Sequence, residues 1–116
     1  MQKTAQAKIW NATLYLRLSR DDGDKEESNS IAGQRNLLRD FLKQHPDIRE
    51  YAVQVDDGWS GSTFERPSFK KMMEDVKAGK TNCIVVKDLS RFGRNYLDAG
   101  EYIEKIFPFM GVRFIA

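Results

Sequence analysis

Arginine and serine side chains follow the ends of several apolar stretches, and these residue types suit phosphate chemistry. Arg17 and Ser19 are two residues apart at the end of the first stretch, so an extended chain turns both to the same side. Arg91 and Arg94 are one helical turn apart after a later stretch, and Arg66 follows a glycine- and serine-rich segment. The arginine guanidinium binds phosphate oxygens bidentately. Together these residues predict a phosphate ester held in line with a serine nucleophile, where positioning and charge stabilisation supply the rate.

Each of these residues also has a simpler interpretation. A single arginine at a strand end is most simply a solvated charge or a surface ion pair, and a lone serine there commonly caps a turn. Only the combination indicates a site. No obvious general base for Ser19 is present, so a serine pKa lowered by the arginines stays a hypothesis. Asp88 either orients an arginine or protonates a leaving oxygen; nearby arginines should lower its pKa, which favours the orienting role.

Further polar residues are secondary candidates. Gln34, one helical turn after Ser30, is a candidate ligand of the serine or of the phosphate, with a solvated helix face as the alternative. Ser60 and Ser62 are expected mainly to form their loop, with a phosphate contact as the alternative. Asn95 is expected to cap a helix. His45 is expected at a helix end, while Cys83, Met72 and Met73 are expected in the core.

Composition limits the class of protein. A chain of 116 residues with 41% hydrophobic content is expected to form one globular domain. A net charge of +2 requires any anion binding to be local. One cysteine and one histidine exclude a disulfide framework and argue against a Cys/His metal site. Without a signal-peptide pattern or an apolar run of about 18 residues, the chain is expected to be soluble and cytoplasmic.

Periodicity predicts alternating strands and helices. The pattern favours strands at 12–18, 50–56, 82–86 and 112–116, and helices at 31–45 with Ser30 as N-cap, from Pro67 to Gly79, and at 95–107. The acidic segment 21–29 is expected to be a mobile loop. This order predicts an α/β fold in three layers, αβα, with a largely parallel central sheet. Ligands of such sheets gather at the carboxyl ends of the strands, where the arginines are expected to meet.

Four segments, in order along the chain, resemble the serine recombinases of the resolvase and invertase type. "YLRLSRDD" resembles the family's Y-x-R-x-S signature, "SIAGQR" its S-x-x-x-Q segment, "DDGWSGSTFERPSF" its mobile loop with the following arginine, and "VVKDLSRFGRN" its D-x-x-R-x-x-R block. The acidic insert and "SGSTFERPSF" resemble the large serine recombinases of mobile elements, such as a TnpX-type transposon resolvase.

The resemblance implies a resolvase-like catalytic domain at 12–116, after a flexible segment at 1–11, in a chain that lacks the dimer helix and DNA-binding region of the family. Ser19 would attack a phosphate of double-stranded DNA and form a 5′-phosphoserine, so that strands are exchanged and rejoined with no cofactor. Arg17, Arg66, Arg91 and Arg94 would hold the phosphate, with Asp88 among the catalytic residues and Gln34 and Ser60 as DNA contacts. The full-length protein would be a dimer that assembles into a synaptic tetramer to excise or insert a mobile element. The fragment alone would be an inactive monomer.

Two other classes share parts of these patterns. A flavodoxin-like or receiver-like module would have the same architecture, but it needs a cofactor loop or acidic residues at strand ends. A phosphatase or nucleotide-binding protein could use the same arginines, but a glycine-rich phosphate loop with its lysine is absent from the sequence.

Overall fold

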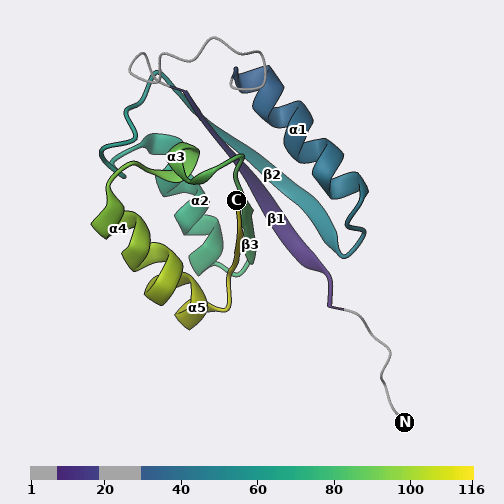
Figure 1. Cartoon of the computed structure of the whole chain (residues 1–116). Helices are drawn as coiled ribbons and strands as arrows, with labels where there is room; N and C mark the ends of the chain where they lie inside the picture. The colour runs from purple at the N-terminus through teal and green to yellow at the C-terminus, as the bar shows by residue number, and fades with distance from the viewer. Residues whose placement is uncertain (1–7, 19–29) are drawn as a thin grey trace.

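The computed structural model describes residues 8–18 and 30–116 (Figure 1). The expected acidic loop at 21–29, the predicted nucleophile Ser19 and most of the expected N-terminal segment lie outside the described residues. The first strand begins at Trp10, two residues before the expected start.

Four parallel strands form the sheet, in the order β2-β1-β3-β4. Their bounds are Trp10–Leu18 for β1, Ile48–Asp57 for β2, Cys83–Val85 for β3 and Arg113–Ile115 for β4. All three strand pairs are parallel, so the carboxyl ends of the strands share one edge. This confirms the expected α/β fold with a largely parallel sheet.

The side chains of β1 alternate between two apolar layers. Leu14 and Leu16 pack with Leu38 on the side of α1, Ile31–Lys43. Tyr15 packs with Phe69 on the side of α2, Pro67–Lys77. Figure 1 shows α1 on one side of the sheet and α2, α4 and α5 on the other. Since side chains of a strand alternate, Arg17 points to the α2 side together with Tyr15.

The first two helices begin where the sequence predicts. The Ser30 Oγ accepts a hydrogen bond from the Gly33 amide at 2.9 Å and caps α1. Pro67 occupies the first turn of α2, where its missing N–H is not needed. Gly79 follows that helix with a φ of 76°, a left-handed conformation that favours glycine.

The expected helix at 95–107 differs from the structure. A four-residue helix, α3 (Leu89–Phe92), precedes it, and the helical segment itself consists of α4 (Tyr96–Glu101), a π-helical turn η3 (Tyr102–Ile106) and α5 (Phe107–Met110). The Asn95 side chain accepts from the Leu97 and Asp98 amides, which confirms it as the cap. Pro108 lies in the first turn of α5, directly after the π turn.

The predicted core residues are in the core. Cys83 and Met72 are fully buried, and Met73 packs at the margin of the aromatic layer. His45 stacks on Phe41 near the end of α1, as expected of a helix-end residue. Among the described residues, no helix has the length and apolar character needed to cross a membrane.

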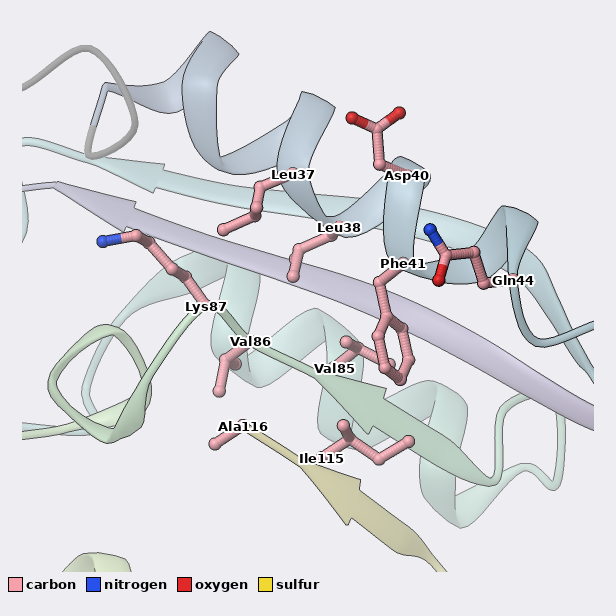
Figure 2. A pocket seen from close by; sticks show the side chains of 10 residues that line it. All are labelled: Leu37, Leu38, Asp40, Phe41, Gln44, Val85, Val86, Lys87, Ile115 and Ala116. Atoms are coloured by element: carbon pink, nitrogen blue, oxygen red, sulfur yellow. The ribbon is translucent and has the colours of Figure 1, made fainter.

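Beside α1, the sheet is only partly covered. A pocket of about 360 Å³ lies between this helix and the β3–β4 half of the sheet. Figure 2 shows Leu37, Leu38 and Phe41 reaching from α1 toward Val85 and Ile115 on the strands. None of the site residues predicted from the sequence lines this pocket.

Candidate active site

Arg17 is the most deeply embedded of the predicted phosphate ligands. Its side chain is buried and donates to the carbonyl oxygens of Ser90, Arg91 at 3.2 Å and Trp59 at 3.0 Å. The last carbonyls of a helix have no partner within it, and in a helix as short as α3 they include Ser90 and Arg91. Arg17 therefore ties the end of β1 to α3 and to the segment that follows β2.

Arg91 completes a reciprocal pair with Arg17. Its Nη1 donates to the Arg17 carbonyl oxygen at 3.2 Å, while the Arg17 Nε donates to the Arg91 carbonyl oxygen. The Arg91 Nε also donates to the Ser90 Oγ at 3.3 Å. The structure thus brings two of the four predicted arginines into one cluster, at the residues just before Ser19.

Arg94 is the exposed arginine of the predicted set. Its amide donates to the Gly61 carbonyl oxygen at 2.6 Å. A Cβ atom at Gly61 would lie 2.7 Å from the Arg17 Nη2 and 2.9 Å from the Arg94 Cγ, so a side chain there would displace one of these two arginines. Arg94 therefore lies next to Arg17, and its side chain is the one of the set most open to a large ligand.

Asp88 is the N-cap of α3. Its Oδ1 accepts from the Ser90 hydroxyl at 2.6 Å and from the Arg91 amide at 3.1 Å. Burial acts to raise the pKa of this carboxyl, but the two hydrogen bonds and the charges of Arg91 and Lys87 outweigh it and leave the pKa below its ordinary value. A lowered pKa suits a carboxylate that orients Arg91 rather than one that donates a proton.

Gln34 is buried on α1, and its alternative as a solvated residue is wrong. Its Nε2 donates to the Arg17 carbonyl oxygen at 3.0 Å, and its Oε1 accepts from the Arg17 amide at 3.4 Å. The side-chain amide thereby pairs with the peptide groups of Arg17 as a neighbouring strand would. Gln34 fixes the backbone two residues before Ser19.

Arg66 does not join this cluster, in contrast to the expectation. Its guanidinium is fully buried and donates to the carbonyl oxygens of Thr63 at 2.6 Å and Phe92 at 2.7 Å and to the Tyr15 hydroxyl at 2.8 Å. The ring of Phe64 lies 4.6 Å from its Cζ. Three acceptors and an aromatic face stabilise Arg66 inside the α2 layer, where it holds the last residue of α3.

Sequence reasoning missed the role of Asp56 beneath Arg66. The buried Asp56 carboxylate accepts from the Tyr15 hydroxyl at 2.6 Å and from the Ser68 and Phe69 amides, both at 2.9 Å. Burial foremost raises the pKa of Tyr15, and the hydrogen bond and charge of Asp56 add to this against the charge of Arg66. Asp56 is the register partner of Arg17, so its position at the end of β2 was the available signal.

The loop serines mainly shape their loop. The Ser60 and Ser62 hydroxyls are hydrogen-bonded to each other at 2.8 Å, and the Ser60 Oγ also accepts from the Ser62 amide. These hydrogen bonds agree with the loop-forming role expected from the sequence. Within residues 8–18 and 30–116, no group of three His, Cys, Asp or Glu side chains is placed to hold a metal ion.

The sequence of this domain matches a known protein family. Residues 12–116 match the family described as the resolvase N-terminal domain. This chain belongs to that family. It is a serine recombinase catalytic domain, as the four sequence motifs predicted, and this excludes the flavodoxin-like and phosphatase alternatives. Serine recombinases act on DNA, so DNA is the partner of this domain.

Solved structures of serine recombinases have the same fold. A resolvase family site-specific recombinase from Streptococcus pneumoniae is 31% identical, with a TM-score of 0.72 over 94% of this chain and 72% of that one. The N-terminal catalytic domain of TP901-1 integrase is 23% identical, with a TM-score of 0.80 over 91% of this chain and 75% of that one. The catalytic domain of ISC1926 TnpA, an IS607-like serine recombinase, is 24% identical, with a TM-score of 0.72 over 90% and 67%. The last two similarities concern the fold alone.

Proposed function

We propose that this domain cuts and rejoins double-stranded DNA through a covalent phosphoserine at Ser19. The observation that carries the proposal is the reciprocal Arg17–Arg91 pair at the carboxyl edge of the sheet. β1 ends at Leu18, and Ser19 is the next residue in the sequence, two positions after Arg17. Gln34 and Arg91 hydrogen-bond to the Arg17 carbonyl oxygen and fix the backbone two residues before Ser19. An in-line displacement requires such control over the approach of the nucleophile.

The reaction exchanges one phosphate ester for another. The Ser19 Oγ attacks the phosphorus and loses its proton, the bond from phosphorus to the 3′ oxygen breaks, and that oxygen takes up a proton. A 3′ hydroxyl of another strand then attacks the phosphoserine and releases Ser19. Each step breaks one phosphate ester bond and forms one, so no nucleotide hydrolysis and no cofactor is needed.

The arginines divide the work in this proposal. Arg91 and Arg94 bind the non-bridging oxygens and stabilise the charge of the transition state. Arg17 and Gln34 hold the backbone that presents Ser19, and Asp88 orients Arg91. Arg66 acts through the Phe92 carbonyl, because a direct phosphate contact would require the loss of its three hydrogen bonds. Ser60 remains a candidate phosphate contact of the loop.

The wider role follows the resemblance to large serine recombinases. We assign the intact recombinase to excision or insertion of a mobile element in a bacterial cytoplasm, as a dimer that assembles into a synaptic tetramer.

The test separates binding of a phosphate from attack on it. In the intact recombinase, Ser19→Ala removes the nucleophile and leaves every arginine, so DNA binding should persist while covalent protein–DNA adducts disappear. Ser68→Ala, which removes a hydroxyl of α2 that donates to the Val55 carbonyl oxygen, should leave adduct formation unchanged. A denaturation-resistant adduct formed by Ser19→Ala would show that Ser19 is not the nucleophile.

A further inference from the structure

Two segments at the carboxyl edge of the sheet carry the exposed part of the site. The site loop, residues 58–66, connects β2 to α2, and the arginine turn, residues 88–95, follows β3. Backbone and side-chain hydrogen bonds join them: the Arg94 amide donates to the Gly61 carbonyl oxygen, and Arg66 of the loop donates to the Phe92 carbonyl oxygen of the turn. The position of Arg94 therefore depends on the position of the site loop.

Phe64 attaches the site loop to the aromatic layer. Its ring centroid lies 4.8 Å from that of Phe69, 5.0 Å from that of Tyr102 and 5.2 Å from that of Phe92. Trp59, the other large aromatic residue of the loop, is 43% exposed. Aromatic pairs at such separations contribute beyond the area they bury. Phe64 is thus the aromatic side chain of the loop that anchors it in the core, together with the buried Arg66.

The Phe64 ring also lies directly against Gly93, between Phe92 and Arg94. A Cβ atom at Gly93 would be 2.5 Å from the Phe64 Cζ and 3.1 Å from its Cε1. The φ of Gly93 is 178°, an extended conformation that any residue adopts, so the backbone does not require glycine here. The requirement is space for the ring. Phe64 and Gly93 are therefore complementary in shape, and they set the distance between the loop and the turn.

The same ring supports Arg66 through a cation–π contact with its Cζ at 4.6 Å. The Arg66 guanidinium in turn holds the Phe92 carbonyl oxygen at 2.7 Å. Phe64 thus acts on the arginine turn by two routes, through direct contact at Gly93 and through Arg66 at Phe92. Both routes converge on the residues that immediately precede Arg94.

We infer that Phe64 is a positioning residue for the recombinase reaction, fixing the site loop against Gly93 so that Arg94 is held beside the Arg17–Arg91 pair. Phe64 itself does not touch DNA in this account. The inference rests on the proposed phosphate-binding role of Arg91 and Arg94. Its structural part, the coupling of Phe64 to the loop and turn, is independent of any DNA chemistry.

The first measurement follows the loop without DNA. The chain has two tryptophans, and Trp10→Phe leaves Trp59 as a reporter within the site loop. In that background, Phe64→Ala should increase the acrylamide quenching constant of Trp59 about twofold or more. Phe107→Leu is the matched control, because the Phe107 ring packs against Phe92, Tyr102 and Phe114 of the same layer. This control should lower stability and leave the quenching of Trp59 unchanged.

The second measurement follows the reaction in the intact recombinase. Phe64→Ala should slow adduct formation at saturating DNA by about 10- to 100-fold, since small misplacements of a positioning group have effects of this size. The dissociation constant for DNA should change by less than about threefold, because Arg91 and Arg94 remain. Phe107→Leu should retain the rate at temperatures well below its unfolding transition.

A compensating pair keeps the inference testable if Phe64→Ala does not fold. Gly93→Ala should slow adduct formation because its methyl group displaces the ring, and Phe64→Leu in the same protein should restore at least part of the rate by making room. Unchanged Trp59 quenching in a folded Phe64→Ala, unchanged adduct formation, or a double variant no better than Gly93→Ala would each overturn the inference. Failure of the Ser19 test would instead overturn the proposed function and leave the quenching result standing.

Discussion

Two arginines that the sequence assigns to phosphate also have a structural task. Arg17 and Arg66 donate to the carbonyl oxygens of three consecutive residues, Ser90, Arg91 and Phe92. A helix of four residues cannot satisfy these carbonyls itself, and a guanidinium has enough donors to do so. The helix that carries Arg91 is therefore held by arginines from elsewhere in the chain.

This arrangement predicts that Arg17→Lys is strongly destabilising. One ammonium group cannot reach the carbonyls of Trp59, Ser90 and Arg91 together, and hydrogen bonds to charged groups contribute about 1.5–3 kcal/mol each. We expect a loss of about 2–4 kcal/mol in the free energy of unfolding, measured by urea denaturation. Arg94→Lys, at an exposed position, should stay within about 0.5 kcal/mol. Equal stabilities of the two variants would contradict this account of Arg17.

The Asp88 cap predicts a pH dependence. Removing a side-chain cap costs about 1 kcal/mol, so Asp88→Ala should lower the free energy of unfolding by about that amount at pH 7. The pKa of Asp88 is lowered in the folded state, so the ionised group stabilises above the ordinary carboxyl pKa and this contribution is lost as the pH falls through the folded value. The gap between wild type and Asp88→Ala should narrow toward pH 3 in urea titrations. A gap of constant size from pH 7 to pH 3 would mean that the charge of Asp88 does not contribute.

At the scale of the elements, local signals predicted the long helices and strands well. Ser30 and Pro67 mark the starts of α1 and α2 because capping and the first helical turn are local chemistry. The short helix α3 has a cap in Asp88, but its four residues are too few to show a helical period, and its carbonyls are satisfied by residues more than twenty positions away. The π turn likewise was not predicted, because no periodicity of the sequence distinguishes it from an ordinary helical turn.

The candidate site was also predicted only in part from the sequence. The meeting of Arg17 and Arg91 was predicted from the gathering of strand ends at one edge of a parallel sheet. The position of Arg66 was not predicted, because its three hydrogen-bond acceptors come from three separate parts of the chain. Asp56 was missed for a similar reason: its partners are Tyr15 on β1 and two amides of α2.

The attachment of α2 to the sheet is testable at Asp56. Asp56→Asn replaces one acceptor oxygen by a donor that would face the donors of Tyr15, Ser68 or Phe69. A buried group left without a partner costs about 1–3 kcal/mol, so we expect a loss of that size in the free energy of unfolding. The neighbouring Asp57→Asn is the control at an exposed position and should change stability by less than about 0.5 kcal/mol. Equal effects of the two substitutions would remove Asp56 from the support of α2.

At the scale of the whole molecule, the net charge is small, but several arginine side chains lie at one edge of the sheet. The net charge is +2, while Arg91 and Arg94 lie together at the carboxyl edge of the sheet. Helices that connect parallel strands run opposite to them, so Lys77 at the end of α2 lies toward the other edge. Among the described residues, the candidate DNA-binding surface therefore offers few phosphate contacts.

This distribution predicts weak binding of the 116-residue chain to DNA, with a shallow salt dependence. With two or three phosphate contacts, the plot of log K against log salt should have a slope of about −2 to −3, and the dissociation constant should be about 10⁻⁴ M or weaker at physiological salt. Fluorescence anisotropy with a labelled duplex over a range of salt concentrations measures both. Arg94→Gln should make the slope shallower by about one, whereas Lys77→Gln, an equal change of charge at the opposite edge, should leave it unchanged. If the two variants changed the slope equally, binding would depend on net charge alone, and the carboxyl edge would not be the surface that meets DNA.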